Sequence, residues 1–359
     1  MFNFGFKKEE TGDKVAAGLD IGTYSIKALQ LKRSGDHQLH LDTYGELEMA
    51  AYDSLPPGSI TEIGEEKLIK AIRDLFLASK ITATKITFSI SMQDCFFSSI
   101  NVPKVSDKEL ATLVPIEVRK YLPIKLSEVK LNYWRTQIAQ EGSDREDVVA
   151  VVAVKNDVFE KYTRLSDKLG FKDFSFEVEN LSAARTILRQ IKEDVPIFHL
   201  DIGGRISFAT LIHDRIVKAT NVISKGSYDN TSQISKILGV GIDVAEEAKR
   251  IFGYLGDSSS PHLGEIMTLA SYPLFDDVKH LLLQHERKYN INIGKVVLSG
   301  GGSLQKGFKK LLSEFLEREV ILIDSFSDFV LPDNLREALK DEDGKYAIAS
   351  GLAMKNLSN

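Results

Sequence analysis

The sequence is poor in the residues that define several classes of protein. It contains one cysteine, Cys95, which excludes an internal disulfide and fits a reducing compartment such as the cytosol. No window approaches the ~20 consecutive apolar residues that a membrane-spanning helix needs. Lysine and arginine form no long block and the net charge is −5, which argues against a nucleic-acid partner. The seven histidines are scattered and predict no metal site.

The length of the chain predicts more than one domain. At 359 residues it exceeds the size at which a single core usually keeps growing. The first residues are aromatic and then basic, and their apolar part is shorter than the ~7–15 residues of a signal peptide. We therefore expect residues 1–13 to form a mobile tail, with contact to a membrane surface as the alternative.

What the sequence does contain is an acidic glycine turn near its start, between Val15 and Leu31. An apolar run ends at Asp20, Gly22 and Thr23 reverse the chain, and β-branched and aliphatic residues follow with no helix start signal. This pattern predicts strand, turn, strand, whereas the glycine turn of a Rossmann fold or a P-loop leads into a helix. Successive backbone N–H groups in such a turn can hold a phosphate.

A second copy of the turn lies between Ile197 and Leu211, with Asp201 aligned to Asp20 and Gly203 to Gly22. The repeat predicts a duplicated architecture with two facing phosphate hairpins. Two carboxylates across a cleft suit a hydrated divalent cation such as Mg²⁺, which would offset the charge of a nucleotide. The alternative is that each Asp-Ile-Gly is merely a tight turn, for which these residues are common.

A third glycine motif runs from Lys295 to Phe308 and reads as a short buried strand, three glycines and the start of a helix. Bare backbone at the glycines would let a flat group lie against it, and Ser303 is available as the helix N-cap. After two Asp-Ile-Gly hairpins, this motif predicts the third wall of a nucleotide cleft.

The segment 85–172 follows a different pattern. It begins with an alternating strand at Lys85, and Ser106 to Glu109 is a capping box that opens a helix. We expect Pro115 to kink or restart that helix. A hairpin follows, and then an amphipathic helix from Asp157 to Leu169, which Gly170 closes as its C-terminal cap. We interpret the segment as an inserted α+β subdomain; the alternative is a simple continuation of the first sheet.

Two further groups are candidates for function. Glu179 begins a helix at a strand end, where it could orient a water or a hydrated cation, or simply compensate the helix dipole. Glu246 and Lys249 lie three apart on a predicted helix and share a face. The alternative for that pair is a local ion pair.

These motifs carry a family resemblance. Asp20 to Lys27, Asp201 to Gly204 and Ser299 to Gly302 resemble the phosphate 1, phosphate 2 and adenosine motifs of the actin, Hsp70 and sugar kinase superfamily. Within it, nearly the whole chain resembles the PilM family of type IV pilus assembly and its FtsA relatives. Further matching stretches are Val102–Leu110, Glu117–Pro123, Val178–Arg185, Ala245–Lys249 and Leu298–Gly307. The resemblance implies an α/β, actin-like (ribonuclease H-like), two-lobed ATPase fold with an inserted α+β subdomain of the FtsA/PilM type.

The resemblance also implies ATP and Mg²⁺ as cofactors and gives residues their roles. It places Gly22, Thr23 and Lys27 at the phosphates, Gly203 and Gly204 on their other side, Asp20 and Asp201 at hydrated Mg²⁺, Glu246 and Lys249 at the ribose and base with Gly300, Gly301, Gly302 and Ser303 beneath, and Glu179 near the attacking water. Tyr24 and Gly226 complete the expected nucleotide site, but both depart from the family pattern. Tyr24 is bulky where a small residue is common, and a second glycine after Gly226 is missing. Asp324 to Phe329 replaces the usual Asn-Pro-Phe.

The expected organisation has eight segments. They are the tail (1–13), the first-lobe core with the phosphate 1 hairpin (14–84), the inserted subdomain (85–172), a return to the first lobe (173–196), the second-lobe core with the phosphate 2 hairpin (197–225), its helical part (226–290), the second-lobe core with the adenosine motif (291–344) and a C-terminal helix on the first lobe (345–359).

The resemblance implies an ATP-binding scaffold of the type IV pilus inner-membrane platform. A nucleotide that touches both lobes favours their closed state. The scaffold would bind the short cytoplasmic N-terminus of a PilN-like bitopic membrane protein, where the inserted subdomain meets the first lobe. A pilus motor or platform protein is a further candidate partner. Contact with the membrane through partners would place the protein in the cytoplasm at the inner membrane.

Two alternatives stay open. A small-molecule kinase of the same superfamily needs a carboxylate base and a substrate pocket, and only Glu179 suggests one. An FtsA-like polymer former on the membrane would be expected to end in an amphipathic helix, which the last residues do not provide. In each case we expect ATP hydrolysis to be slow at most.

Overall fold

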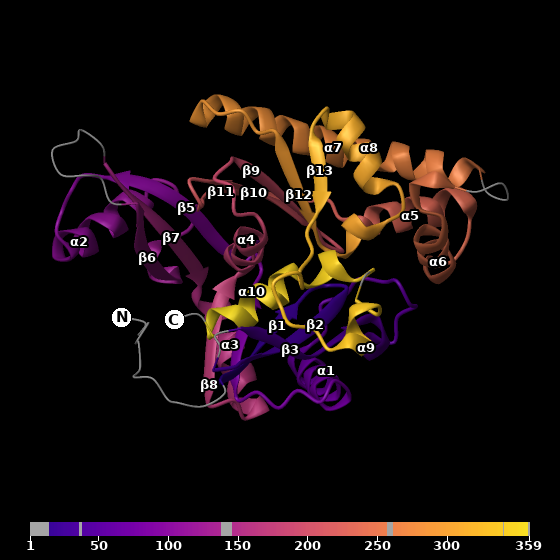
Figure 1. The fold of residues 1–359 in the computed structure, drawn as a ribbon, viewed down its shortest axis with the longest axis horizontal. Helices are drawn as coiled ribbons and strands as arrows, with labels where there is room; N and C mark the ends of the chain where they lie inside the picture. Colours follow the sequence, from indigo (N-terminus) through magenta and orange to yellow (C-terminus); the bar gives the residue numbers. More distant parts are fainter. Residues whose placement is uncertain (1–13, 36–37, 138–145, 257–260, 340, 358–359) are drawn as a thin grey trace.

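The computed structural model describes residues 14–35, 38–137, 146–256, 261–339 and 341–357, and the expected N-terminal tail lies outside them. Within these ranges the strands form two five-stranded sheets and one three-stranded sheet. Figure 1 shows the first-lobe sheet below, the second-lobe sheet above it, and the three-stranded sheet projecting to one side. None of the helices in the described ranges is long and apolar enough to cross a bilayer.

The two large sheets have the same strand order. The first is β3 (Leu39–Glu48), β2 (Ser25–Arg33), β1 (Lys14–Ile21), β4 (Lys85–Ile90) and β8 (Asp173–Val178). The second is β11 (Ile216–Ile223), β10 (Ser207–His213), β9 (Ile197–Ile202), β12 (Lys295–Ser299) and β13 (Glu319–Leu322). Both predicted hairpins are confirmed, since β1 pairs antiparallel with β2 and β9 with β10. Their central strands are buried on both faces, which explains their nearly continuous apolar sequences.

The helices cover these sheets. The α-helices are α1 (Glu65–Ala78), α2 (Asp107–Val118), α3 (Asn156–Leu169), α4 (Glu179–Gln190), α5 (Ser227–Leu238), α6 (Ile242–Phe252), α7 (Pro261–Tyr289), α8 (Phe308–Leu316), α9 (Asp333–Arg336) and α10 (Ala347–Lys355). Short 3₁₀ turns are η1 (Ala50–Asp53), η2 (Leu126–Glu128), η3 (Gly253–Leu255), η4 (Gly301–Leu304) and η5 (Asp343–Tyr346). The sequence analysis did not identify α7, whose apolar pattern is interrupted by Pro273.

The inserted unit is smaller than the expected segment 85–172. Strand β4 pairs in parallel with β1 and β8, so it belongs to the first-lobe sheet. Helix α3 buries Val158, Tyr162 and Leu165 in the first-lobe core. The unit that remains is α2 with the sheet β5 (Cys95–Val102), β7 (Asp147–Lys155) and β6 (Val129–Gln137). Alternation in the sequence predicted that these strands exist, but it does not say which sheet a strand joins.

Local sequence signals in segment 85–172 correctly predicted two features. The capping box is present, with the Ser106 hydroxyl accepting from the Glu109 backbone N–H at 3.3 Å and the Glu109 carboxylate accepting from the Ser106 N–H at 2.8 Å. Gly170 ends α3 in the left-handed conformation, with φ +80°. Of the two outcomes expected at Pro115, a kink or a restart, the restart does not occur, because α2 runs through that residue to Val118.

Helix α10 lies unusually close to β1 and α4. A Cβ at Gly18 would lie 2.2 Å from the carbonyl oxygen of Ala349, and one at Gly351 would lie 1.9 Å from that of Ser182. Both contacts require glycine, because no side chain fits against backbone at that distance. They fix the C-terminal helix on the first lobe.

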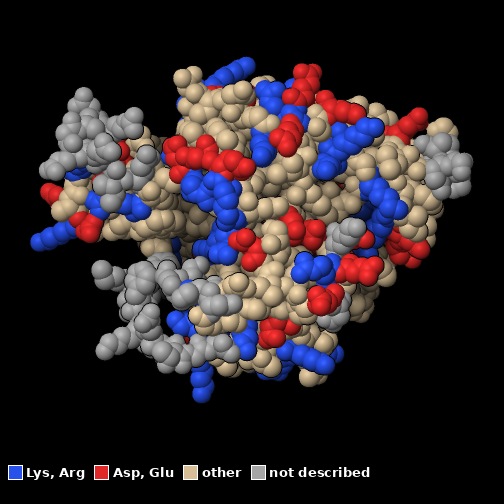
Figure 2. All heavy atoms as spheres, in the orientation of Figure 1, with Lys and Arg blue, Asp and Glu red and all other residues tan. Residues whose placement is uncertain are grey.

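The surface is polar and mixed in sign. On the face drawn in Figure 2, basic and acidic side chains are interspersed rather than gathered into one field. Many of these charges are paired, as in Arg189 and Asp328, whose Nε and Oδ2 atoms are 2.7 Å apart.

Candidate functional site

The two Asp-Ile-Gly turns meet between the lobes. A Cβ at Gly204 in the second turn would lie 3.0 Å from the Cβ of Tyr24 and 3.5 Å from the Oγ1 of Thr23 in the first. The first turn is held in place because the Thr61 N–H donates to the Thr23 carbonyl at 2.9 Å and the Met49 N–H to the Tyr24 carbonyl at 2.9 Å. The hairpins therefore face each other and are in contact.

Asp20 ends β1 in a row of charged residues. In the sheet register it lies opposite Lys27, and Lys27 lies opposite Glu46. The Lys27 Nζ is 3.4 Å from a Glu46 carboxylate oxygen and donates to the Ser25 hydroxyl at 2.8 Å. Burial raises the pKa of Asp20, and Lys27 opposes that rise. The Oδ1 atom of Asp20 is buried and has no hydrogen-bond partner.

Asp201 ends β9 and is held by a chain of buried hydrogen bonds. The Ser299 hydroxyl on β12 donates to Asp201 Oδ2 at 2.5 Å, and His199 Nε2 lies 2.7 Å from the same hydroxyl. Burial lowers the pKa of His199 to about 3, so the ring is neutral. Because the serine proton is committed to Asp201, the Nε2 atom of His199 must carry the ring proton and donate it. Burial raises the pKa of Asp201 to about 6.

Glu179 lies at the start of α4, beside both aspartates. Its carboxylate accepts a hydrogen bond from the Met92 N–H at 2.9 Å. Burial and the neighbouring charge of Asp20 raise the pKa of Glu179 well above its usual range. Among the described residues no group of three or more His, Cys, Asp and Glu side chains forms a direct metal cage.

Glycine is required where the second turn meets α5. A Cβ at Gly203 would lie 2.5 Å from the carbonyl oxygen of Ile206, and one at Gly226 would lie 2.4 Å from that of Gly204. The N–H groups of Ser227 and Tyr228 donate to the carbonyls of Gly203 and Gly204 at 2.9 and 3.0 Å. Ser227 stands where the family pattern has a second glycine. Because Ser227 contributes to this wall through its backbone N–H, the wall does not depend on that glycine. In the first turn, a Cβ at Gly22 would lie 3.1 Å from the Ser25 carbonyl oxygen.

The third glycine loop lies directly behind the second turn. Gly300 has φ +83°, and a Cβ on it would lie 2.4 Å from the Ile202 carbonyl oxygen. A Cβ on Gly302 would lie 2.8 Å from the Cβ of Ser227, whereas Gly301 has open space around it. The predicted N-cap role of Ser303 is wrong, because its hydroxyl donates to the Gly300 carbonyl at 2.7 Å and α8 begins after Gly307.

Glu246 and Lys249 lie on α6 and form a buried ion pair, with Nζ and Oε2 2.7 Å apart. The Lys249 Nζ also donates to the Thr231 hydroxyl at 2.8 Å and to the Ser227 carbonyl at 3.2 Å. The alternative prediction, that Glu246 and Lys249 form a local ion pair, is therefore confirmed. The same contacts also fix α6 against the start of α5, beside the glycine loop.

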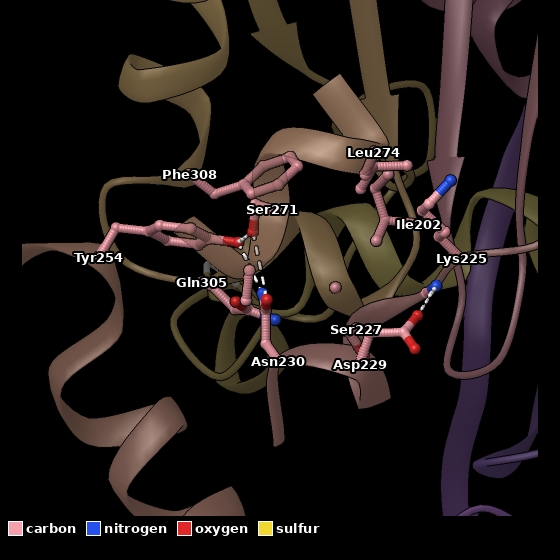
Figure 3. Close-up of a pocket in the computed structure, with 13 residues that line it drawn as sticks. Ile202, Lys225, Ser227, Asp229, Asn230, Tyr254, Ser271, Leu274, Gln305 and Phe308 are labelled. Carbon is pink, nitrogen blue, oxygen red and sulfur yellow. Dashed lines mark hydrogen bonds between the residues drawn. The ribbon is translucent and has the colours of Figure 1, made fainter. Parts of the chain in front are cut away.

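A small cavity lies behind this loop (Figure 3). Its volume is about 20 Å³, and its walls include Gly226, Gly302 and Gln305. Beside it, the Asn230 amide donates to the Tyr254 hydroxyl at 2.8 Å, and that hydroxyl lies 2.7 Å from Ser271 Oγ. The space suits about one water molecule rather than a nucleotide. These hydrogen-bonded side chains lie behind the glycine loop, and no sequence pattern predicted them.

A second missed residue is Ser89 on β4. It occupies the position in the first sheet that Ser299 occupies in the second, and its hydroxyl accepts from the Ile21 N–H at 3.0 Å. The signal was present, because Lys85-Ile-Thr-Phe-Ser89 repeats the pattern of Lys295-Val-Val-Leu-Ser299. Assigning Lys85 to the inserted subdomain hid that repeat.

Two lobes with the same strand order, facing Asp-Ile-Gly turns and a glycine loop behind the second define an actin-like two-lobed ATPase fold. The structure is similar to the PilM-PilN type IV pilus biogenesis complex, with a TM-score of 0.81 and 21% identity over 96% of this chain and 99% of that one. It is also similar to MreB 5 of Spiroplasma citri bound to AMPPNP, with a TM-score of 0.52 and 14% identity over 96% and 95% of the two chains.

Sequence comparison gives the family. The family profile described as type IV pilus assembly protein PilM matches residues 18–357, and the chain belongs to this family. It is also 23% identical to the cell division protein FtsA of Neisseria meningitidis serogroup B over 267 residues. That match covers 69% of this chain and 64% of FtsA, which is less than two thirds of the relative's length.

Proposed function

We propose that this protein binds ATP with Mg²⁺ between its lobes and serves as a nucleotide-loaded scaffold of the type IV pilus inner-membrane platform. The observation that carries the nucleotide site is the meeting of the two turns, with Asp20 Oδ1 buried and unpartnered beside them. The similar MreB 5 structure is described as bound to AMPPNP, a nucleotide analogue, which supports a nucleotide ligand for this fold.

The residues present fit such a ligand. Buried carboxylates with raised pKa values are short of positive charge, and a hydrated divalent cation would supply it. Asp20 and Asp201 would hold the waters of that cation, and the backbone of Gly22, Gly203 and their neighbours would hold phosphate oxygens. When bound, the cation would neutralise phosphate charge between the lobes.

The family resemblance supplies roles for the remaining candidates. Lys27 would contact the phosphates. Glu246 and Lys249 would lie at the ribose and base above Gly300 to Ser303. Glu179 would orient the attacking water. Its carboxylate already accepts a hydrogen bond from the Met92 N–H, and we expect hydrolysis to be slow at most.

Calorimetric titration of ATP with and without Mg²⁺ tests the nucleotide site. In the wild type we expect Mg²⁺ to tighten binding. In the variant that combines Asp20→Asn with Asp201→Asn the effect of Mg²⁺ should disappear, because asparagine keeps the shape but not the charge. A Mg²⁺ effect of wild-type size in this variant would remove the proposed cation role.

The proposed partner is the cytoplasmic N-terminal peptide of a PilN-like membrane protein. Family membership and similarity to a structure described as a PilM-PilN complex support it. The peptide would dock where the β5, β6 and β7 sheet meets the first lobe. There Phe97, Val152 and Val154 of the inserted sheet join the first-lobe core. Such a partner would hold the protein at the cytoplasmic side of the inner membrane; a pilus motor or platform protein remains a second candidate.

Fluorescence anisotropy with a labelled PilN-like N-terminal peptide tests this partner. We expect saturable binding that a scrambled peptide of the same composition does not show, and tighter binding when ATP and Mg²⁺ are present. A small-molecule kinase would ignore both peptides, so equal signals from the two would contradict the scaffold proposal.

A further inference from the structure

A group of polar side chains crosses the mouth of the cleft, where α6 faces the first lobe. Tyr24 in the first turn donates its hydroxyl proton to Glu48 Oε1 at 2.7 Å. Arg250 on α6 donates to the same oxygen at 2.9 Å and also to the Tyr24 hydroxyl. Its guanidinium lies over the Tyr24 ring, 5.5 Å from the centroid. One arginine of the second lobe thus binds two residues of the first.

Arg250 is itself fixed within its own lobe. Its Nε atom donates to Glu246 Oε1 at 3.0 Å, so the guanidinium spans two carboxylates, one from each lobe. Burial together with the carboxylates of Glu46 and Glu246 raises the pKa of Glu48, and the charge of Lys345 opposes that rise. Without Arg250, Glu48 of the first lobe and Glu246 of the second would lose the cation that they share.

The two lobes also approach each other closely at Gly58. A Cβ at Gly58 in the first lobe would lie 2.5 Å from the Cβ of Glu246. The other oxygen of Glu246 is taken by the Thr231 hydroxyl at 2.6 Å and by Lys249. The side chain proposed to reach the ribose is therefore already occupied and covered from the first lobe. A nucleoside could reach it only after these contacts separate.

We propose that Tyr24, Glu48 and Arg250 form a clasp that holds the lobes closed and controls the exchange of nucleotide. This inference rests on the proposed nucleotide site, which it supplies with a gate. Tyr24, whose bulk departs from the family pattern, is the residue that makes the clasp possible in this chain. The clasp is half-exposed and built from side-chain contacts, so it can open without unfolding either lobe.

The distance between the lobes tests the clasp without any ligand. Spin labels at Leu77→Cys on α1 and Leu269→Cys on α7, both exposed, report it in a Cys95→Ala background of the full chain. Double electron–electron resonance should give one narrow distance for the parent protein. Arg250→Ala and Glu48→Gln should each add a longer distance. Arg189→Ala should not, because it removes a pair of similar exposure with Asp328, whose segment packs on the first-lobe strands through Phe326 and Phe329.

Release of radiolabelled ATP, chased with unlabelled ATP, then tests the gate. Both clasp variants should release ATP several-fold faster than the parent and Arg189→Ala. Distances in Arg250→Ala and Glu48→Gln that coincide with the parent would overturn the clasp even if ATP binds normally. Longer distances in these variants, with no ATP bound by any form, would support the clasp while removing the nucleotide function.

Discussion

The two lobes build their Asp-Ile-Gly turns on the same sheet but surround them with different side chains. Across the first sheet the register runs Asp20, Lys27, Glu46, and across the second it runs Asp201, Phe208, Val222. The first aspartate thus lies beside a cation, and the second lies beside an apolar ring. Although the two backbones match, the first lobe presents charged residues beside its aspartate and the second lobe presents an apolar ring.

The strand positions behind the aspartates differ as well. Gly18 on β1 leaves room for α10, while His199 occupies the corresponding place on β9 and supports Ser299. Burial raises the pKa of both aspartates, and the largest influence that opposes the rise is the charge of Lys27 at Asp20 and the Ser299 hydroxyl at Asp201. The two aspartates thus share the cause of their raised pKa values and differ in what limits the rise.

The prediction with the largest expected effect adds a side chain to the first lobe at Gly18, where the second lobe has His199. Gly18→Ala places a Cβ 2.2 Å from the Ala349 carbonyl oxygen and 2.7 Å from the Ala353 nitrogen, so α10 must move. We expect a loss of about 3 kcal/mol in the free energy of unfolding, measured with urea. Gly294→Ala, where no atom lies within 4 Å, is the control and should change stability by less than about 0.5 kcal/mol. Equal effects would show that α10 does not depend on Gly18.

The second prediction concerns His199, which has no counterpart in the first lobe. Its pKa is about 3 in the folded protein against 6.5 unfolded, so the unfolded chain alone gains a proton as the pH falls from 6.5 to 3. Stability is lost over that window. At pH 4.5 the loss from this group is about 2–3 kcal/mol relative to pH 7. His199→Gln keeps a donor for Ser299 but cannot titrate, so urea unfolding at both pH values should show a smaller acid loss by that amount. The same loss in both proteins would contradict this account.

The paired serines sharpen the comparison further. Ser299→Ala leaves His199 and Asp201 without partners, and the sheet row of Asp201 holds no cation. We expect it to cost about 2 kcal/mol, within the usual range for unpaired buried polar groups. Ser89→Ala should cost about 1 kcal/mol, because Asp20 keeps Lys27 beside it. Urea unfolding of the two variants side by side measures the difference, and a larger cost at Ser89 would reverse the assignment.

Local features of this chain could be predicted from its sequence. Turn chemistry predicted both hairpins, the Ser106 capping box and the left-handed Gly170, because each depends on residues a few positions apart. The same turns identified Asp20 and Asp201 as candidate residues of the functional site.

Features that depend on distant partners could not be predicted from local patterns alone. The sheet to which β4 belongs is decided by its neighbours β1 and β8, and the alternation of Lys85 to Ile90 fits either sheet. The Ser303 prediction failed because Ser303 lies inside the 3₁₀ turn η4 (Gly301–Leu304), and α8 begins only at Phe308. The contact of Arg250 with Tyr24 joins residues 226 positions apart, on different lobes, and no local pattern marks it.

The last prediction tests whether the charged side of the cleft serves the nucleotide. Lys27→Met keeps the length of the side chain and removes the cation beside Asp20, so ATP affinity should fall about tenfold, or ~1.4 kcal/mol. Phe208→Met, at the matching position of the second lobe, is the control and should leave the affinity of the folded protein unchanged. Calorimetric titration with ATP and Mg²⁺ measures both. A loss of equal size at the two positions would mean that the variants act through the shape of the cleft, and that the charge of Lys27 is not what distinguishes the lobes.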